Sequence, residues 1–139
     1  MSSDEVFDIY IDGASKNNPG PAGVGVIICR GEEVVKNVSR FLGEATNNIA
    51  EYSALICALE EAVSLGIKRV RINTDSQLVY RQIKREYKVK DRNIRVMFEK
   101  ALMLCCRFDH FDIRHIPRDQ NKGADRLANI AVKTAIEKK

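Results

Sequence analysis

The chain has 139 residues, of which 45% are hydrophobic, and a formal net charge of +4 at pH 7. This size fits a single domain with an ordinary hydrophobic core. Because no apolar run approaches the roughly 20 residues of a membrane-spanning helix, and no secretion signal precedes the first motif, we expect one soluble, cytoplasmic domain over residues 1–139 without membrane contacts.

The cysteines indicate a reducing environment. They form no C-x-x-C pair, and neither histidine completes a metal-ligand spacing with them, which disfavours a zinc site. We expect reduced, mostly buried side chains that behave as small hydrophobic residues, at Cys29, Cys57, Cys105 and Cys106.

Three antiparallel strands are predicted to open the chain. Residues 6–11 alternate, with Phe7, Ile9 and Ile11 on one face, as in a strand with one apolar face. Turn residues occupy 13–21, and the apolar stretches 22–29 and 34–41 flank the tight turn of a predicted hairpin. Asp12 follows the first predicted strand directly.

The pattern changes to a helical period over residues 46–66, with Asn47 or Asn48 as the expected N-cap and Gly66 as the expected end. Glu51 lies at the edge of the apolar stripe of this helix, whereas Glu60 and Glu61 project away from it. The stripe consists of Tyr52, Leu55, Ile56, Leu59, Ala62 and Val63.

Strands and helices alternate in the second half. We expect a strand at 68–75, helices at 76–87 and 93–108, a strand at 110–117, and a final helix at 121–139 capped by Asn121. A right-handed strand–helix–strand crossover would make the strand that ends in Asp75 parallel to one of the first three strands. Asp125 falls in the first turns of the final helix, beside apolar residues. The order predicts an α/β fold.

Four acidic residues lie where a solvated charge is not expected: Asp12, Glu51, Asp75 and Asp125. If the strands of Asp12 and Asp75 are parallel neighbours, both carboxylates lie at the carboxyl ends of the strands, where such sheets bind ligands. Like charges this close repel, and burial raises their pKa unless a cation neutralises them. Oxygen ligands favour Mg²⁺ or Mn²⁺, and two such ions, about 3.5–4 Å apart, would activate water and stabilise a leaving oxygen in phosphodiester hydrolysis.

Asp12 and Asp75, which each end a predicted strand, could also have an ordinary structural role. Asp12 can begin an Asx turn, and Asp75 can cap the following helix. Either residue alone is explained equally well in this way. The four together are not, because independent caps have no reason to gather at one edge of a sheet.

Four segments resemble the signature segments of ribonuclease H type 1: residues 11–23 (IDGASKNNPGPAG), 46–55 (TNNIAEYSAL), 73–79 (NTDSQLV) and 121–128 (NKGADRLA). The resemblance covers nearly the whole chain and implies a five-stranded mixed sheet, three antiparallel strands and then two parallel ones, with helices on both faces. It implies hydrolysis of the RNA strand of RNA/DNA hybrids, leaving 5′-phosphate and 3′-hydroxyl ends. The catalytic set that binds two Mg²⁺ or Mn²⁺ ions would be Asp12, Glu51, Asp75 and Asp125, with Asp12 between the ions.

The same motifs imply contacts with the hybrid from Asn18, Thr46, Asn47, Asn48 and Gln77. Short amides and hydroxyls can read 2′-hydroxyls and base edges in a wide, shallow minor groove. Turn and cap chemistry is the alternative role, and both roles are compatible at one residue.

The chain departs from many bacterial members of the family in two places. It has no long loop with a mobile histidine before the final helix, so His115 is expected to have a structural role in the fifth strand, and Arg118 is the nearest candidate for an auxiliary role. It also lacks the tryptophan-containing basic protrusion with which some relatives grip the DNA strand. The sequence therefore resembles the shorter-loop branch, and a monomer is expected.

Two other functions stay open from the sequence. One is a non-catalytic module that binds hybrid or RNA, although such modules lose a carboxylate and all four are present here. The other is a related nuclease that acts on DNA junctions or on double-stranded RNA, the latter beside hybrids, since the short loop and the missing protrusion leave room for it.

Positive charge is concentrated between Arg81 and Arg95, where seven cationic residues stand against two acidic ones. A solvated helix face explains this by charge alone, whereas the resemblance favours phosphate contacts. We therefore predict that neutralising Lys84, Arg85 and Lys88 together weakens hybrid binding and flattens its salt dependence without abolishing cleavage. The salt dependence of the dissociation constant measures this. If its slope is unchanged in the variant, these residues belong to a solvated helix face and do not contact phosphates.

Overall fold

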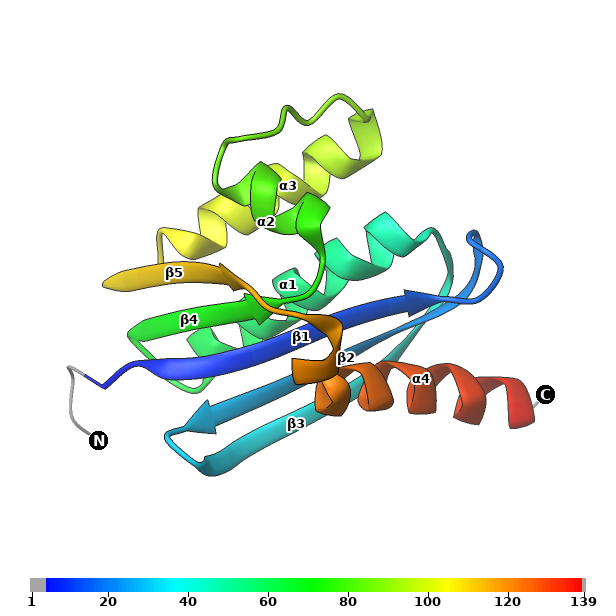
Figure 1. Cartoon of the computed structure of the whole chain (residues 1–139), viewed down its shortest axis with the longest axis horizontal. Coiled ribbons are helices and arrows are strands. Elements are labelled where there is room, and N and C mark those ends of the chain that lie inside the picture. The colour runs from blue at the N-terminus through cyan, green and yellow to red at the C-terminus, as the bar shows by residue number, and fades with distance from the viewer. Residues whose placement is uncertain (1–4, 139) are drawn as a thin grey trace.

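The computed structural model describes residues 5–138, which form one five-stranded sheet with helices on both faces (Figure 1). In chain order the elements are β1 (Phe7–Ser15), β2 (Gly20–Arg30), β3 (Glu33–Ala45), α1 (Asn47–Ser64), β4 (Arg69–Thr74), α2 (Gln77–Ile83), α3 (Arg92–Cys105), β5 (His110–His115), a short 3-10 turn (Arg118–Gln120) and α4 (Lys122–Glu137).

The sheet has the strand order β3-β2-β1-β4-β5. The first three strands are antiparallel, whereas β4 runs parallel to β1 and β5 runs parallel to β4. The predicted fold class is confirmed. The assignment of residues 1–139 to one domain stays a prediction.

Two layers of unequal size cover the sheet. On one face α1 packs against β1 and β2, with α3 packed on α1 and α2 beside β4 and β5. On the opposite face α4 lies alone across β1, β2 and β3 (Figure 1). The main core lies under α1, where the alternation predicted for the first strand is confirmed, because Phe7, Ile9 and Ile11 are all buried.

Several predicted boundaries were wrong. Because β1 keeps pairing with β2 as far as Ser15, Asp12 lies inside the strand and pairs with Gly25. The helix predicted to reach residue 87 ends at Ile83, and Arg85 adopts a left-handed backbone with φ of 64°. Within this turn the amide of Glu86 donates to the carbonyl of Arg81, which closes the helix.

Some predicted caps and burial classes were also wrong. Thr46, not Asn47 or Asn48, caps α1, since its hydroxyl accepts from the amide of Ile49 at 3.2 Å. Gly66 does end the helix, with φ of 74°. The four cysteines are free, but only Cys57 is buried; Cys29 in β2 and Cys105 at the end of α3 are partly exposed, and Cys106 is exposed.

Among residues 5–138, no helix is both long enough and apolar enough to cross a bilayer.

Candidate active site

The parallel pairing of β1 with β4 brings two of the four predicted carboxylates together. Ile11 and Thr74 form the last pair of this ladder, so Asp12 and Asp75 leave it at the same level. Glu51, from the first half of α1, completes the group. One carboxylate oxygen from each of these three residues lies within 4.8 Å of the others. The predicted neighbourhood of these three side chains is confirmed.

Glu51 reaches the group because α1 lies directly against β1. A Cβ atom at Gly13 would lie 2.2 Å from the carbonyl carbon of Ala50, so only glycine allows this approach. The amide of Gly13 donates to Oε1 of Glu51 at 2.7 Å. Gly13 therefore both allows α1 to approach β1 and positions the carboxylate of Glu51.

Asp125 reaches the site from the other face of the sheet, where a second glycine allows a helix to approach a strand closely. Gly25, the partner of Asp12 in the ladder, faces α4, and a Cβ atom there would lie 2.0 Å from the carbonyl oxygen of Ala124. Asp125 lies near enough to Asp12 to help raise its pKa, and it lines the same cavity of about 320 Å³. It lies beside the tight group of three and is not a member of it.

Burial and mutual repulsion raise the pKa of the two innermost carboxyl groups. Asp12 is only 6% exposed, and burial, followed by the charge of Glu51, raises its pKa to about 9. Burial also raises the pKa of Glu51 to about 7, although the hydrogen bond from Gly13 and the charge of Arg118 act in the opposite direction. The cluster is thus electrostatically unfavourable without a cation, and its all-oxygen donor set suits a hard divalent ion.

Asn121 has a role that the sequence did not reveal. Its side chain does not cap α4. It donates instead to the carbonyl of Ile11 at 2.8 Å and to Oδ2 of Asp75 at 3.3 Å. The residue is 1% exposed, and its Oδ1 is buried without a hydrogen-bond partner among the described residues. An asparagine before a helix looks like a cap in sequence, and no local signal distinguishes it from this long-range contact.

Three of the four carboxylates accept a hydrogen bond from an N–H group, which fixes the position of one oxygen. Gly13 donates to Glu51, Asn121 donates to Asp75, and the side-chain nitrogen of Asn129 donates to Oδ1 of Asp125 at 3.1 Å. Such contacts orient carboxylates in the way that outer residues orient metal ligands. The amide of Asn129 was not predicted to take part.

His115 lies in β5, as predicted, next to the backbone of the site. Its Nε2 is 3.3 Å from the carbonyl oxygen of Asp75, and its ring stacks on Tyr80 with centroids 5.7 Å apart. Arg118, the predicted auxiliary residue, lines the cavity together with Asp12, Glu51 and Asp125.

The residues predicted to touch a substrate divide into two groups. Asn47 lines the cavity and accepts from the amide of Ser15 at 3.0 Å, and Asn18 is joined to it by accepting from the amide of Asn47 at 2.8 Å. Thr46 and Asn48 flank Asn47 at the start of α1. The others lie outside this cavity, along or beyond α2: Gln77, Lys84, Arg85 and Lys88.

Comparison with known proteins assigns the family. Residues 10–131 match the family described as "Reverse transcriptase-like". Ribonuclease H of Syntrophotalea carbinolica is 31% identical over 144 residues, which cover 94% of this chain and 93% of the relative. Ribonuclease HI of Halobacterium salinarum is 42% identical over 91% of this chain. The chain belongs to the ribonuclease H type 1 family.

Solved structures of this family superpose closely on the chain. A ribonuclease H1 of Halobacterium salinarum has a TM-score of 0.91 and 41% identity, with 93% of this chain and 98% of that one covered. A ribonuclease H1 isolated from compost and crystallised with an RNA/DNA hybrid has a TM-score of 0.89 and 38% identity, with 94% and 99% covered. The chain spans only 64% of the curated Halobacterium relative and 36% of a bifunctional protein of Mycobacterium tuberculosis.

The raised pKa of Asp12 predicts a pH-dependent stability in chelator. The folded protein keeps a proton on Asp12 that the unfolded chain loses near pH 4, so the free energy of unfolding falls as the pH rises from about 4 toward about 9. Asp12→Asn removes this penalty. It should stabilise the metal-free protein at pH 8 by on the order of 2 kcal/mol and flatten the pH profile.

Urea unfolding in EDTA at several pH values measures this, with the exposed Asp119→Asn as the matched control. If Asp12→Asn is no more stable than the wild type at pH 8, the cluster does not repel as described.

Proposed function

We propose that the chain is a metal-dependent endoribonuclease that hydrolyses the RNA strand of RNA/DNA hybrids and leaves 5′-phosphate and 3′-hydroxyl ends. The observation that carries this proposal is the convergence of Asp12, Glu51 and Asp75 within 4.8 Å, with Asp125 beside them. Membership of the ribonuclease H type 1 family supports it, as does the relative that was crystallised with a hybrid.

The donor set fits two Mg²⁺ or Mn²⁺ ions. All its ligand atoms are carboxylate oxygens, and no cysteine or histidine of residues 5–138 belongs to the group. Asp12, Glu51, Asp75 and Asp125 would hold the ions, with Asp12 at the centre. When bound, the ions supply an activated water and stabilise the leaving 3′-oxygen.

The chain's own residues prepare the site before any ion binds. The amide of Gly13 engages one oxygen of Glu51 and leaves the other for coordination. Asn121 does the same for Asp75. Arg118 lines the cavity as its cationic residue, and we assign it the auxiliary role of holding a charged phosphate near the carboxylates.

The rim of the cavity suits a strand that carries 2′-hydroxyl groups. The side-chain oxygens of Asn18 and Asn47 are already engaged, so their NH₂ groups are available to donate to a hydroxyl or a base edge. Thr46 and Asn48, which flank Asn47, would join these contacts, and so would Gln77 at the start of α2, outside the cavity. Beyond α2, the cationic residues Lys84, Arg85 and Lys88 would meet phosphates of the duplex. A monomer in the cytoplasm is the state that we assign to the protein.

Cleavage of a labelled hybrid tests the proposal. The wild type should cut the RNA strand in Mg²⁺ or Mn²⁺ and not in EDTA, whereas Asp75→Asn should lose at least a hundredfold in rate, because removing one carboxylate disrupts ion binding. Asp112→Asn, on the neighbouring strand and outside the cluster, is the matched control and should cut normally.

Double-stranded RNA and DNA of the same sequence define the substrate range. Binding of the hybrid without cleavage in either metal would refute the enzyme and favour a binding module on the same fold.

A further inference from the structure

The sheet has an open edge at β3, which lies at the lower margin of the sheet in Figure 1. Within residues 5–138, β3 pairs only with β2, so its outer backbone groups have no strand partner. The strand has 13 residues, and residues 36–41 pair with β2 without interruption. The N–H and C=O groups along such an edge can pair with a further extended chain.

The cations of this stretch do not protect the edge. Nζ of Lys36 lies 2.5 Å from the carboxylate of Glu61 on α1, and the guanidinium of Arg40 lies 3.5 Å from the same carboxylate. Both cations are thus drawn onto the face of the sheet that α1 covers. β3 also contains no proline. The edge therefore lacks the usual features that keep other chains from pairing with it.

Two cavities flank the same stretch on opposite faces of the sheet. One, of about 300 Å³, lies between β3 and α4 and is lined by Ser39 and Phe41 of β3. The other, of about 280 Å³, lies between β3, α1 and α3 and is lined by Arg40 and Leu42 of β3. Successive side chains of an added strand would point to the two faces in turn, as those of β3 do. Each cavity is therefore placed to receive side chains from such a strand.

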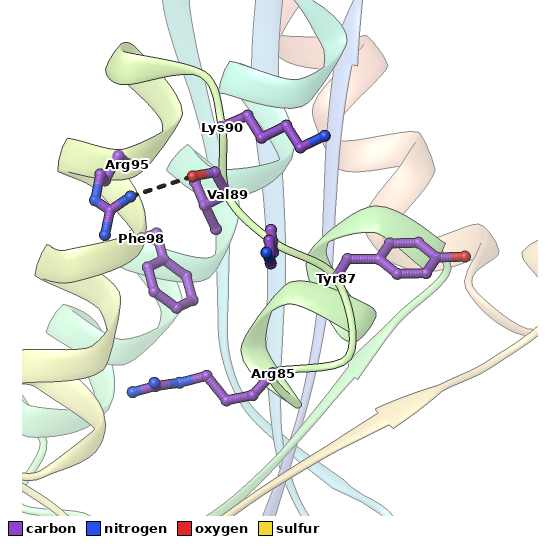
Figure 2. Close-up of a pocket in the computed structure, with 7 residues that line it drawn as sticks. Arg85, Tyr87, Val89, Lys90, Arg95 and Phe98 are labelled. Carbon is purple, nitrogen blue, oxygen red and sulfur yellow. Dashed lines mark hydrogen bonds between the residues drawn. The ribbon is translucent and has the colours of Figure 1, made fainter.

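Both cavities are mainly apolar. They differ in this from the cavity of about 610 Å³ beside α3, where Figure 2 shows Lys90 and Arg95 near Phe98. Among residues 5–138, nine large hydrophobic side chains are exposed, and five of these lie on β3 or line the two cavities: Val34, Val35, Phe41, Val96 and Ile130. Exposed apolar groups that gather on one surface are typical of a protein interface.

The charge near the edge favours an acidic partner. Lys138 lines the cavity under α4 and forms no ion pair within residues 5–138. On the other face, Lys36 and Arg40 share the single carboxylate of Glu61, which leaves one positive charge uncompensated. Acidic residues beside the apolar ones of an added strand would complement this charge.

We propose that the edge of β3 binds an extended segment of another protein, which adds a sixth strand to the sheet. Apolar side chains of the segment enter the two cavities in turn, and its acidic residues lie near Lys138 and Arg40. Backbone hydrogen bonds give such a complex its affinity, and the cavities give it specificity. None of the lining residues belongs to the carboxylate cluster, so the inference does not depend on the proposed function.

Two octapeptides with blocked ends test the proposal. Both have valine, phenylalanine, isoleucine and leucine as central residues, with two aspartates at each end in one peptide and two lysines at each end in the other. The aspartate peptide should bind the intact chain and protect amides within residues 36–41 from hydrogen exchange. The lysine peptide should bind about tenfold more weakly, because its charge opposes that of the edge.

N-methylation of the aspartate peptide distinguishes strand pairing from simple apolar contact. In an added strand, the N–H groups of alternate residues point toward β3 and the others point toward solvent. Methylation of one alternate set should therefore weaken binding about tenfold, and methylation of the other set should change it less than about twofold.

Variants of the protein locate the site. Ile130→Asp places a charge in the cavity under α4 and should weaken binding of the aspartate peptide about tenfold. Met103→Asp is the matched control, since Met103 is exposed on α3 and lines neither cavity, and it should bind normally. An unchanged melting temperature shows that both variants fold.

Three results would overturn the proposal. The first is that neither peptide binds saturably, and the second is that both methylated sets bind equally well or equally poorly. The third is that the protein alone forms dimers that Ile130→Asp dissociates, because a second copy of the chain would then occupy the edge.

Discussion

The close approach of two helix backbones to neighbouring strands is the constraint on which the site depends. Gly13 admits α1 to β1, and Gly25 admits α4 to β2 from the opposite face. Because these glycines lie beside Asp12 in sequence and in the ladder, each contact delivers one more carboxylate to it. Asp75 arrives by the parallel pairing of β4 alone. A side chain at either glycine would push a helix away from the sheet and separate the carboxylates.

Polar contacts then fix what the backbone has brought together. Asn121 joins the end of β1 to Asp75, although it is 110 residues away from Ile11 in sequence. Gln82 joins the cationic segment after α2 to Tyr52 in a similar way. Buried amides of this kind are costly unless they are paired, so each one specifies a single arrangement of the elements that it connects.

Much of this arrangement could be predicted from the sequence. The alternation of residues 6–11, the helical stripe around Tyr52 and the order of elements fix the sheet and its crossover, and the sheet in turn places Asp12 beside Asp75. Other features had no local signal. The hydroxyl of Thr46 and the side-chain amides of Asn47 and Asn48 are equivalent cap candidates in the sequence. Asn121 also looks like a helix cap in the sequence, although its side chain contacts Ile11 and Asp75. The left-handed turn at Arg85 interrupts a segment whose composition is still helical.

Repulsion among the carboxylates connects the fold to the proposed chemistry. The fold places these like charges close together, and a bound cation would neutralise their repulsion. The most direct test is the melting temperature of the wild type and of Asp12→Asn, each with and without saturating Mg²⁺ or Mn²⁺. An ion that binds only the folded cluster stabilises it by mass action. We expect a clear rise in the wild type and a much smaller one in Asp12→Asn; an equal rise in both proteins would mean that the ions bind elsewhere and would contradict this account.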